Sequence, residues 1–418
     1  MADNIKILTD EASAGEVEAQ LQLADLYESG FGVPMDRGQA AFWYHKAAEQ
    51  GLAKAQSRLG QMYISGLGVP QDLKQAVHWL TLAAEQDDAV AQANLGWCYQ
   101  EKLGVSKDYV QAFVWYHKAA EQGHAGARYN LGFMYANGIG TEKNYHEAVK
   151  WYERAAEQGH KKAQLNVGMM YAGGIGVERD QATAVKWYQQ AANKGYAKAQ
   201  YNLALMYAGG HGVEQDDKEA FKWQEMAANQ GYYKAQFNLG LFYLYGLGTE
   251  QDYAMAFDLF SRAAQQNYAK AYYQLGKMYA NGYGVSVDEI QSANYYQRAA
   301  DQGYTKAQYR LGRLYQHGKG VKQDPAVACQ WLEKAASQGY TKAQYSLGVC
   351  YAKGQGVQQD LVVAYAWLSL VAEDDDKKVR EILDKLKVHL KQKDIDEAGK
   401  LAKEWRAGYS KKTKAPVN

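Results

Sequence analysis

The chain is poor in cysteine, in proline and in long apolar runs. Its 418 residues include three cysteines and four prolines, and an odd, sparse set of cysteines does not make a disulfide framework. No stretch is apolar for long enough to span a bilayer. Residues 1–15 lack the basic start and the apolar run of a signal peptide. These features favour a cytoplasmic protein with reduced cysteines and no membrane partner.

An excess of one charge and a metal-binding pattern are missing as well. Lys and Arg number 47 against 46 Asp and Glu, so the formal net charge is +1, and nothing favours a nucleic acid as partner. The nine histidines form no pattern with Cys or Glu at the spacing of metal ligands. No Lys-Ser or Lys-Thr follows the glycine-rich stretches, as a phosphate-binding loop requires. We therefore expect no metal, no cofactor and no catalytic residue.

Glycine, in contrast, is abundant and falls in register. A unit of 36 residues, clearest in residues 123–158, matches the chain ten times between Gly15 and Asp374 without insertion or deletion. Self-similarity at a fixed period is typical of a solenoid, in which each unit packs on its neighbours. The ten copies start near Gly15, Gly51, Asp87, Gly123, Gly159, Gly195, Gly231, Asn267, Gly303 and Gly339.

Each copy predicts two helices joined by a loop, which makes an all-α fold. In the second copy, Ala55 and Leu59 belong to the apolar face of the first helix. Gly68 would supply the positive φ of the loop, and Asp72 would cap the second helix, whose apolar face includes Trp79. The positions equivalent to Ala55 and Gly68 hold the same residue in all ten copies, which indicates that geometry dictates them.

The two ends of the chain depart from the repeat. Residues 1–14 resemble the second half of a copy and predict a lone helix that caps the N-terminal end. Residues 375–408 predict two amphipathic helices, with Asp394 and Glu397 near the start of the second, which would cover the last copy. Residues 409–418 are basic and polar, and we expect them to be disordered.

The repeat pattern resembles a known family. Over residues 15–374, LG-x-MY-x-x-G-x-GV-x-x-D alternates with A-x-x-WY-x-KAA-x-QG, which is similar to the Sel-one-like (Sel1-like) repeat family, a relative of the tetratricopeptide repeats. The ending AYAWLSLVAEDD, followed by DEAGKLAKEW, resembles the terminal segment of bacterial members. The resemblance implies a right-handed α-solenoid superhelix of helix-turn-helix repeats. It also implies an adaptor that binds proteins or peptides and is not an enzyme.

In helix-pair solenoids of this type, the first helices line a concave groove. With Leu59 at the centre of the buried face, Ser57 and Gln61 of the second copy lie on the opposite side, and Arg58 lies at the border. The equivalents of these three positions in the third to eighth copies supply the candidate binding residues: Asn94, Trp97, Tyr129, Asn130, Phe133, Asn166, Met169, Tyr201, Asn202, Leu205, Phe237, Asn238, Leu241 and Tyr273.

The equivalents of Gln61 are apolar from the third to the seventh copy and mostly polar or charged elsewhere. Such a row, flanked by asparagines, suits an extended peptide or a partner helix, because apolar side chains give burial and amides bind backbone. Alternatively, the Tyr and Asn columns serve only to pack neighbouring repeats, or a neighbouring molecule or the protein's own terminus covers the row. A column of lysines that includes Lys306 and Lys342 would meet an acidic partner or form a solvated edge.

The sequence therefore predicts a non-enzymatic scaffold that binds a peptide segment or partner protein in its concave groove. One alternative is a secreted factor directed at a host or competitor protein, such as a virulence or immunity protein. Another is a small-molecule hydrolase, for which no cluster of titratable residues is seen. Cys98, Cys329 and Cys350 occupy apolar positions of their helices, so we expect buried, inert thiols.

Overall fold

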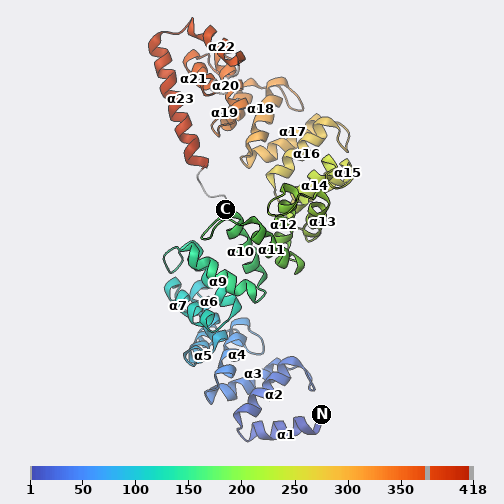
Figure 1. The fold of residues 1–418 in the computed structure, drawn as a ribbon, viewed down its shortest axis with the longest axis vertical. Helices are drawn as coiled ribbons and strands as arrows, with labels where there is room; N and C mark the ends of the chain where they lie inside the picture. Colours follow the sequence, from blue (N-terminus) through green and yellow to red (C-terminus); the bar gives the residue numbers. More distant parts are fainter. Residues whose placement is uncertain (1, 372–376, 414–418) are drawn as a thin grey trace. The chain divides into compact units, whose positions relative to one another are not determined.

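The computed structural model describes residues 2–371 and 377–413 of the chain. The described residues form helices and no strand. By the density of its internal contacts the chain divides into two units, Met1–Gln215 and Asp216–Asn418, whose helices follow one another in chain order in Figure 1. The first unit holds α1 (Ala2–Ser13), α2 (Val17–Ser29), α3 (Arg37–Glu49), α4 (Ala53–Ser65), α5 (Leu73–Glu85), α6 (Ala89–Glu101), α7 (Tyr109–Glu121), α8 (Ala125–Asn137), α9 (Tyr145–Glu157), α10 (Lys161–Gly173), α11 (Gln181–Asn193) and α12 (Ala197–Gly209).

The second unit continues the same alternation and ends with two helices outside it. It holds α13 (Asp217–Asn229), α14 (Tyr233–Tyr245), α15 (Tyr253–Gln265), α16 (Ala269–Asn281), α17 (Glu289–Asp301), α18 (Thr305–His317), α19 (Pro325–Ala336), α20 (Thr341–Lys353), α21 (Leu361–Val371), α22 (Lys377–Lys387) and α23 (Gln392–Thr413). From α1 to α12 in the first unit and from α13 to α22 in the second, every helix packs on the next one along the chain. The expected α-solenoid of helix pairs is thereby confirmed.

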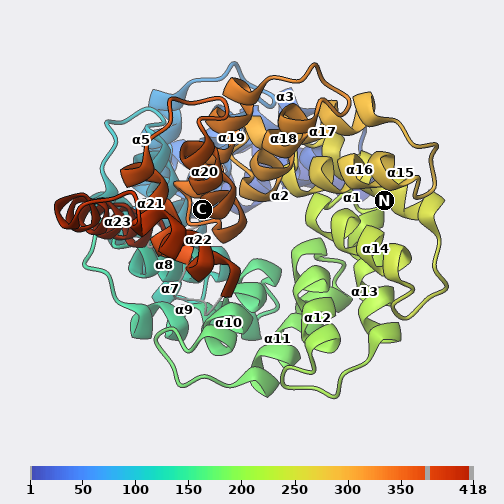
Figure 2. The same cartoon turned by 90° about the horizontal axis from the view of Figure 1, so that it is seen from above.

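The even-numbered helices α2 to α20 are the first helices of the repeats, and the odd-numbered helices α3 to α21 are the second. Figure 2 shows that α10 and α12 lie on the inner side of the first unit and α11 on its outer side. In the second unit α16 and α18 lie on the inner side and α15 on the outer side (Figure 2). The first helices therefore present the inner surface of each unit.

The capping residue and the loop glycine predicted from the sequence are found at the helix boundaries. The Asp72 carboxylate accepts hydrogen bonds from the backbone N–H groups of Lys74 and Gln75, at 2.9 and 3.1 Å, and so caps α5. Gly68 has a φ of +79°, and a Cβ at this position would overlap the carbonyl group of Arg37 in the preceding repeat. Glycine is thus required for its backbone angle and also for the close contact between neighbouring repeats.

Small residues let the two helices of a repeat approach closely. Ala55 on α4 and Ala76 on α5 are fully buried. A Cβ on Gly60 would come within 2.7 Å of the Leu80 side chain on α5, a distance that real side chains do not adopt. The core between the helices is consequently built from a large residue on one helix facing glycine or alanine on the other.

A buried glutamine joins successive repeats, which the sequence patterns did not indicate. The Gln56 amide donates to the Ala48 carbonyl, at 3.1 Å, and accepts from the Gln86 amide, at 2.8 Å. Buried polar groups need such partners, since an unpaired amide would cost stability. The same position is buried glutamine at Gln20, Gln56, Gln92, Gln164, Gln200, Gln236, Gln308 and Gln344.

The two ends carry the additional helices. Gln20 donates to the Ala12 carbonyl of α1, at 3.0 Å. Gln56 makes the equivalent bond to the Ala48 carbonyl of the second helix α3. The helix α1 therefore occupies the place of the second helix of a preceding repeat. At the other end, α22 and α23 pack on α21, and Trp405 stacks on Trp367 with their ring centroids 4.0 Å apart.

Two boundaries at the C-terminal end differ from the sequence-based expectation. The helix α23 begins at Gln392, two residues before Asp394, whose carboxylate accepts from the backbone N–H of Lys391. The same helix continues to Thr413, into the stretch 409–418 that was expected to be disordered. Residues 414–418, and residues 372–376 between α21 and α22, lie outside the described part of the chain.

Candidate interaction surface

The first unit carries a row of exposed apolar side chains on its first helices, which we call the apolar strip. It consists of Trp97 on α6, Phe133 on α8, Met169 on α10 and Leu205 on α12. These side chains are 40%, 42%, 50% and 40% exposed, respectively. Leu131, two residues before Phe133, is fully buried, so the strip lies on the face of each helix away from the core.

The equivalent position changes character in the second unit. Leu241 on α14 is only partly exposed and packs against the core cluster that contains Phe237. The next equivalents are Lys277 on α16 and Arg313 on α18, both half-buried. The exposed apolar surface at this column therefore belongs to the first unit.

Three of the asparagines contact buried tyrosines of the preceding repeat. The Asn166 side chain lies beside the Tyr152 hydroxyl, and the Asn202 side chain lies beside the Tyr188 hydroxyl. Burial raises the pKa of Tyr188 to about 12, and the Asn202 side chain opposes that rise. Asn130 lies beside the buried Tyr116 hydroxyl, which has no hydrogen-bond partner among the described residues. These amides thus take part in packing between repeats.

The remaining two asparagines have a different neighbour at the same position. The position that holds Tyr152 in the fourth repeat holds Leu80 in the repeat before Asn94 and Gln224 in the repeat before Asn238. Neither of these asparagines therefore meets a tyrosine hydroxyl at that position. Both asparagines are half-exposed. Asn94 lies one turn before Trp97 on α6, next to the apolar strip.

The aromatic column beside the strip also packs repeats together. Phe237 is only 9% exposed, and its ring lies 5.6 Å from that of Phe260 and 5.2 Å from that of Tyr268. Phe237 therefore belongs to the core and offers little surface to a partner.

The tyrosines of that column are half-buried and share its packing role. The Tyr129 ring lies 4.7 Å from the imidazole of His160, and the Tyr273 ring lies 5.2 Å from that of Tyr304. Tyr201 is half-buried too. The Tyr129 and Tyr273 rings thus contact residues of the next repeat.

The chain's similarity to known proteins agrees with this architecture. The Sel1 repeat family model matches residues 17–52, 53–88, 89–124, 125–160, 161–196, 197–232, 234–268, 269–304, 305–340 and 341–376. The chain belongs to the Sel1 repeat family. Sel1 repeats generally serve as scaffolds for protein interaction, and the fold is not a catalytic one. No curated protein matches the chain.

Two solved structures of Sel1 proteins are similar over most of their length. A protective antigen present in uropathogenic Escherichia coli strains, which displays the same repeat fold, is 32% identical, with a TM-score of 0.69 over 99% of this chain and 98% of that chain. A Sel1 repeat protein from Oxalobacter formigenes is 38% identical, with a TM-score of 0.62 over 74% of this chain and 90% of that chain.

The three cysteine thiols of this chain are buried. Burial raises the pKa of the Cys98 thiol to about 11, so it is protonated and unreactive at neutral pH. The Cys329 thiol contacts Cys350 and donates to the Gln355 carbonyl, at 3.0 Å. Among the described residues there is no group of three or more His, Cys, Asp or Glu side chains that could hold a metal ion. None of the described helices is long and apolar enough to cross a membrane.

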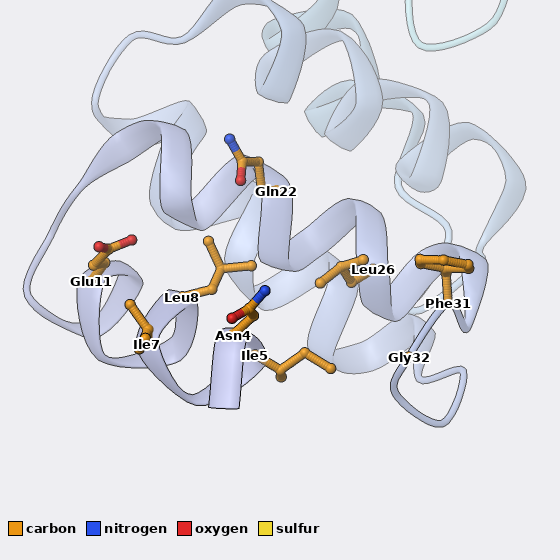
Figure 3. A pocket seen from close by; sticks show the side chains of 9 residues that line it. All are labelled: Asn4, Ile5, Ile7, Leu8, Glu11, Gln22, Leu26, Phe31 and Gly32. Carbon is orange, nitrogen blue, oxygen red and sulfur yellow. The ribbon is translucent and has the colours of Figure 1, made fainter. Parts of the chain in front are cut away.

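A cavity of about 580 Å³ opens at the N-terminal end of the first unit. Its lining comes from α1, α2 and the loop after α2 (Figure 3), namely Asn4, Ile5, Ile7, Leu8, Glu11, Gln22, Leu26, Phe31 and Gly32. Asn4 and Glu11 are exposed here, whereas their equivalents Ala40 and Ala47 are fully buried by the first helix of their own repeat. The cavity thus lies on the side of α1 that, in the second helix of a complete repeat, is covered by the first helix of that repeat.

Proposed function

We propose that this Sel1 repeat protein is a non-enzymatic scaffold that binds a segment of a partner protein on the first-helix surface of its first unit. The observation that carries the proposal is the apolar strip, in which four successive first helices each expose one large apolar side chain. A contiguous apolar surface is rarely left exposed on a soluble protein without a partner.

The strip suits an extended peptide or one face of a helix. Its members recur once per repeat, so a partner segment that crosses the first helices would meet them in turn. Burying an aromatic side chain such as Trp97 or Phe133 at an interface contributes about 2 kcal/mol where it is a hot spot. Asn94, beside Trp97, has both a donor and an acceptor with which to bind the partner's backbone.

The other candidates have different parts in this proposal. Asn130, Asn166, Asn202, Tyr129 and Tyr201 would hold the first helices in register and border the strip. Asn238, Leu241 and Tyr273 belong to the second unit and would contact a partner separately from the strip. Phe237 would contribute only to the packing of the core and would not contact the partner.

The test is capture of partners from the native host by the wild-type chain and by the double variant Trp97→Ala/Phe133→Ala, quantified by mass spectrometry. The matched control is Phe42→Ala/Val114→Ala, which removes side chains of 49% and 39% exposure from the second helices α3 and α7. The proposal expects specific partners to be lost with the first variant and kept with the control. Equal retention by both variants would show that the strip is not the binding surface.

A second copy of the chain is the other occupant to examine. Light scattering on the purified protein distinguishes the two cases, since a partner-binding scaffold is expected to be monomeric. A dimer that Trp97→Ala/Phe133→Ala converts to a monomer would assign the strip to self-association instead.

A further inference from the structure

The first helices of the last three repeats carry basic residues and no acidic ones. The helices α16, α18 and α20 contain no Asp or Glu. Six basic side chains of these helices, each exposed or half-buried, make up what we call the basic face: Lys270, Lys277, Lys306, Arg310, Arg313 and Lys342. All six belong to the second unit, so the basic face is distinct from the apolar strip.

The positive charges of the basic face are not neutralised within the described residues. None of the six side chains forms an ion pair with a described Asp or Glu. The carboxylates of Asp288 and Asp324, in the loops that follow α16 and α18, accept hydrogen bonds from the backbone N–H groups that begin α17 and α19, so they serve as helix caps. Burial, together with Arg310 and Lys306, lowers the pKa of Lys277, as expected where like charges crowd together.

Two of the cations lie beside aromatic side chains. Arg310 lies beside the Tyr273 hydroxyl, and a guanidinium nitrogen of Arg313 lies 3.0 Å from Nε2 of His317. Tyr309, Arg313, Lys342 and Tyr345 contribute to the lining of a cavity of about 360 Å³ in this face. A carboxylate that enters the cavity would meet both basic side chains.

The aromatic rings of this surface favour a protein partner over a single-stranded nucleic acid. Single-stranded nucleic acids bind by stacking their bases on open aromatic faces. Here Tyr273 packs edge-to-face with Tyr304, at 5.2 Å between ring centroids, and Tyr309 does so with Tyr340, at 5.3 Å. The rings are thus engaged inside the protein, whereas the cations remain available.

We propose that the basic face is a docking surface for an acidic segment of a partner protein. The inference rests on the proposed scaffold function only in taking the partner to be a protein. An extended peptide advances about 3.3 Å per residue. A segment with an acidic residue at every third position would therefore present a carboxylate about every 10 Å along the basic face.

The probe is a fluorescein-labelled peptide of 15 residues, with Glu at every third position and Gly or Ser elsewhere. Its counterpart has Gln in place of Glu, and a third probe is a labelled RNA of 15 nucleotides. Fluorescence anisotropy measures their binding to the full chain and to Lys277→Gln/Lys306→Gln/Arg313→Gln. The matched control, Lys222→Gln/Arg262→Gln/Lys334→Gln, removes the same charge from the second helices α13, α15 and α19 of the same unit.

The proposal expects the Glu peptide to bind and the Gln peptide not to bind. The basic-face variant should bind the Glu peptide about tenfold more weakly or worse, while the control variant binds it like the wild type. Circular dichroism must give both variants the wild-type helix content. Absence of binding by the wild type, or an equal loss in both variants, would overturn the proposal. Tighter binding of RNA than of the Glu peptide would overturn it too, in favour of a nucleic-acid surface.

The strip variant Trp97→Ala/Phe133→Ala separates this inference from the proposed function. It should bind the Glu peptide as tightly as the wild type, because its substitutions lie in the other unit. If that result holds while the variant still captures every host partner, the strip proposal fails and the basic face stands. If the strip variant loses the Glu peptide, the basic face is not the binding site.

Discussion

The inner surfaces of the two units are built on the same repeat but carry different chemistry. At one column the first unit exposes Trp97, Phe133, Met169 and Leu205, whereas the second unit has the half-buried Leu241, Lys277, Arg313 and Val349 at the equivalent places. The helices α8 and α18, which present Phe133 and Arg313, are both 13 residues long and both end at a glycine of positive φ. The difference teaches that the repeat determines where a side chain is displayed, while the residue at the open column determines the chemistry displayed there.

The largest expected effect concerns the fixed columns that both units share. Gly68→Ala should lower the free energy of unfolding by about 3 kcal/mol, because alanine is strained at positive φ and would overlap the Arg37 carbonyl. Gly51 also has a positive φ but nothing within 4 Å of an added Cβ, so Gly51→Ala should cost about 1 kcal/mol. Chemical unfolding followed by circular dichroism measures both, and equal losses would show that the contact between repeats does not require glycine.

The next effect converts the chemistry of one unit into that of the other. Met169→Lys/Leu205→Arg gives the first unit the residue types of the basic face. Because both side chains are exposed, thermal stability should change little, while binding of a strip partner should weaken at least about tenfold through the loss of buried apolar area. Isothermal titration with a captured partner measures the affinity, and an unchanged value would mean that these two residues are outside the interface.

Salt should distinguish the two surfaces without any substitution. Raising the KCl concentration from about 50 mM to about 300 mM shortens the screening length, so the Glu peptide should dissociate from the basic face. A partner held by the apolar strip should keep its affinity, since apolar burial does not depend on screening. Anisotropy titrations at the two concentrations test this, and an equal response of both complexes would remove the chemical distinction between the units.

The smallest effect concerns repulsion within the basic face. Burial and the neighbouring cations Arg310 and Lys306 lower the pKa of Lys277 in the folded chain. The charged lysine therefore destabilises the fold at neutral pH, and the destabilisation is lost as the pH rises through the folded pKa toward the unfolded value. Lys277→Gln should raise stability at pH 7 by about 0.5 kcal/mol or less after solvent screening.

The stability advantage of Lys277→Gln should shrink as the pH approaches about 10, near the ordinary pKa of lysine. Thermal unfolding of the wild type and the variant at both pH values measures it. Lys222→Gln, on a second helix where Lys222 pairs with Glu219 at 3.1 Å, is the control and should show no such gain. A gain that persists at high pH would have a cause other than charge.

The sequence was informative about positions that backbone geometry dictates. Gly68 and Asp72 identify the loop and the start of the second helix, because few other residues tolerate a positive φ or cap a helix. The role of Gln56 was not predictable from one helix, since its partners Ala48 and Gln86 lie in other elements. The division of the chain between Gln215 and Asp216 leaves no mark in the repeat pattern.

Aromatic side chains on the face away from the core were the hardest to place from the sequence. Trp97 and Phe133 point well away from the core, as the helical wheel indicates. The wheel places Phe237 equally far from the core, but its burial depends on Phe260 and Tyr268 of the same and the next repeat. Such contacts between repeats decide whether an aromatic side chain is an anchor or part of the core, and periodicity alone does not describe them.

The most direct test of the central claim compares two residues on α8. Leu131 is fully buried and Phe133 is 42% exposed, so the first should matter for folding and the second for recognition. The decisive measurement is the affinity of a purified partner for Phe133→Ala at unchanged melting temperature, with Leu131→Ala as the variant that loses stability. The account predicts that Phe133→Ala binds about tenfold more weakly or worse than the wild type. Wild-type affinity in Phe133→Ala would contradict the assignment of recognition to the apolar strip.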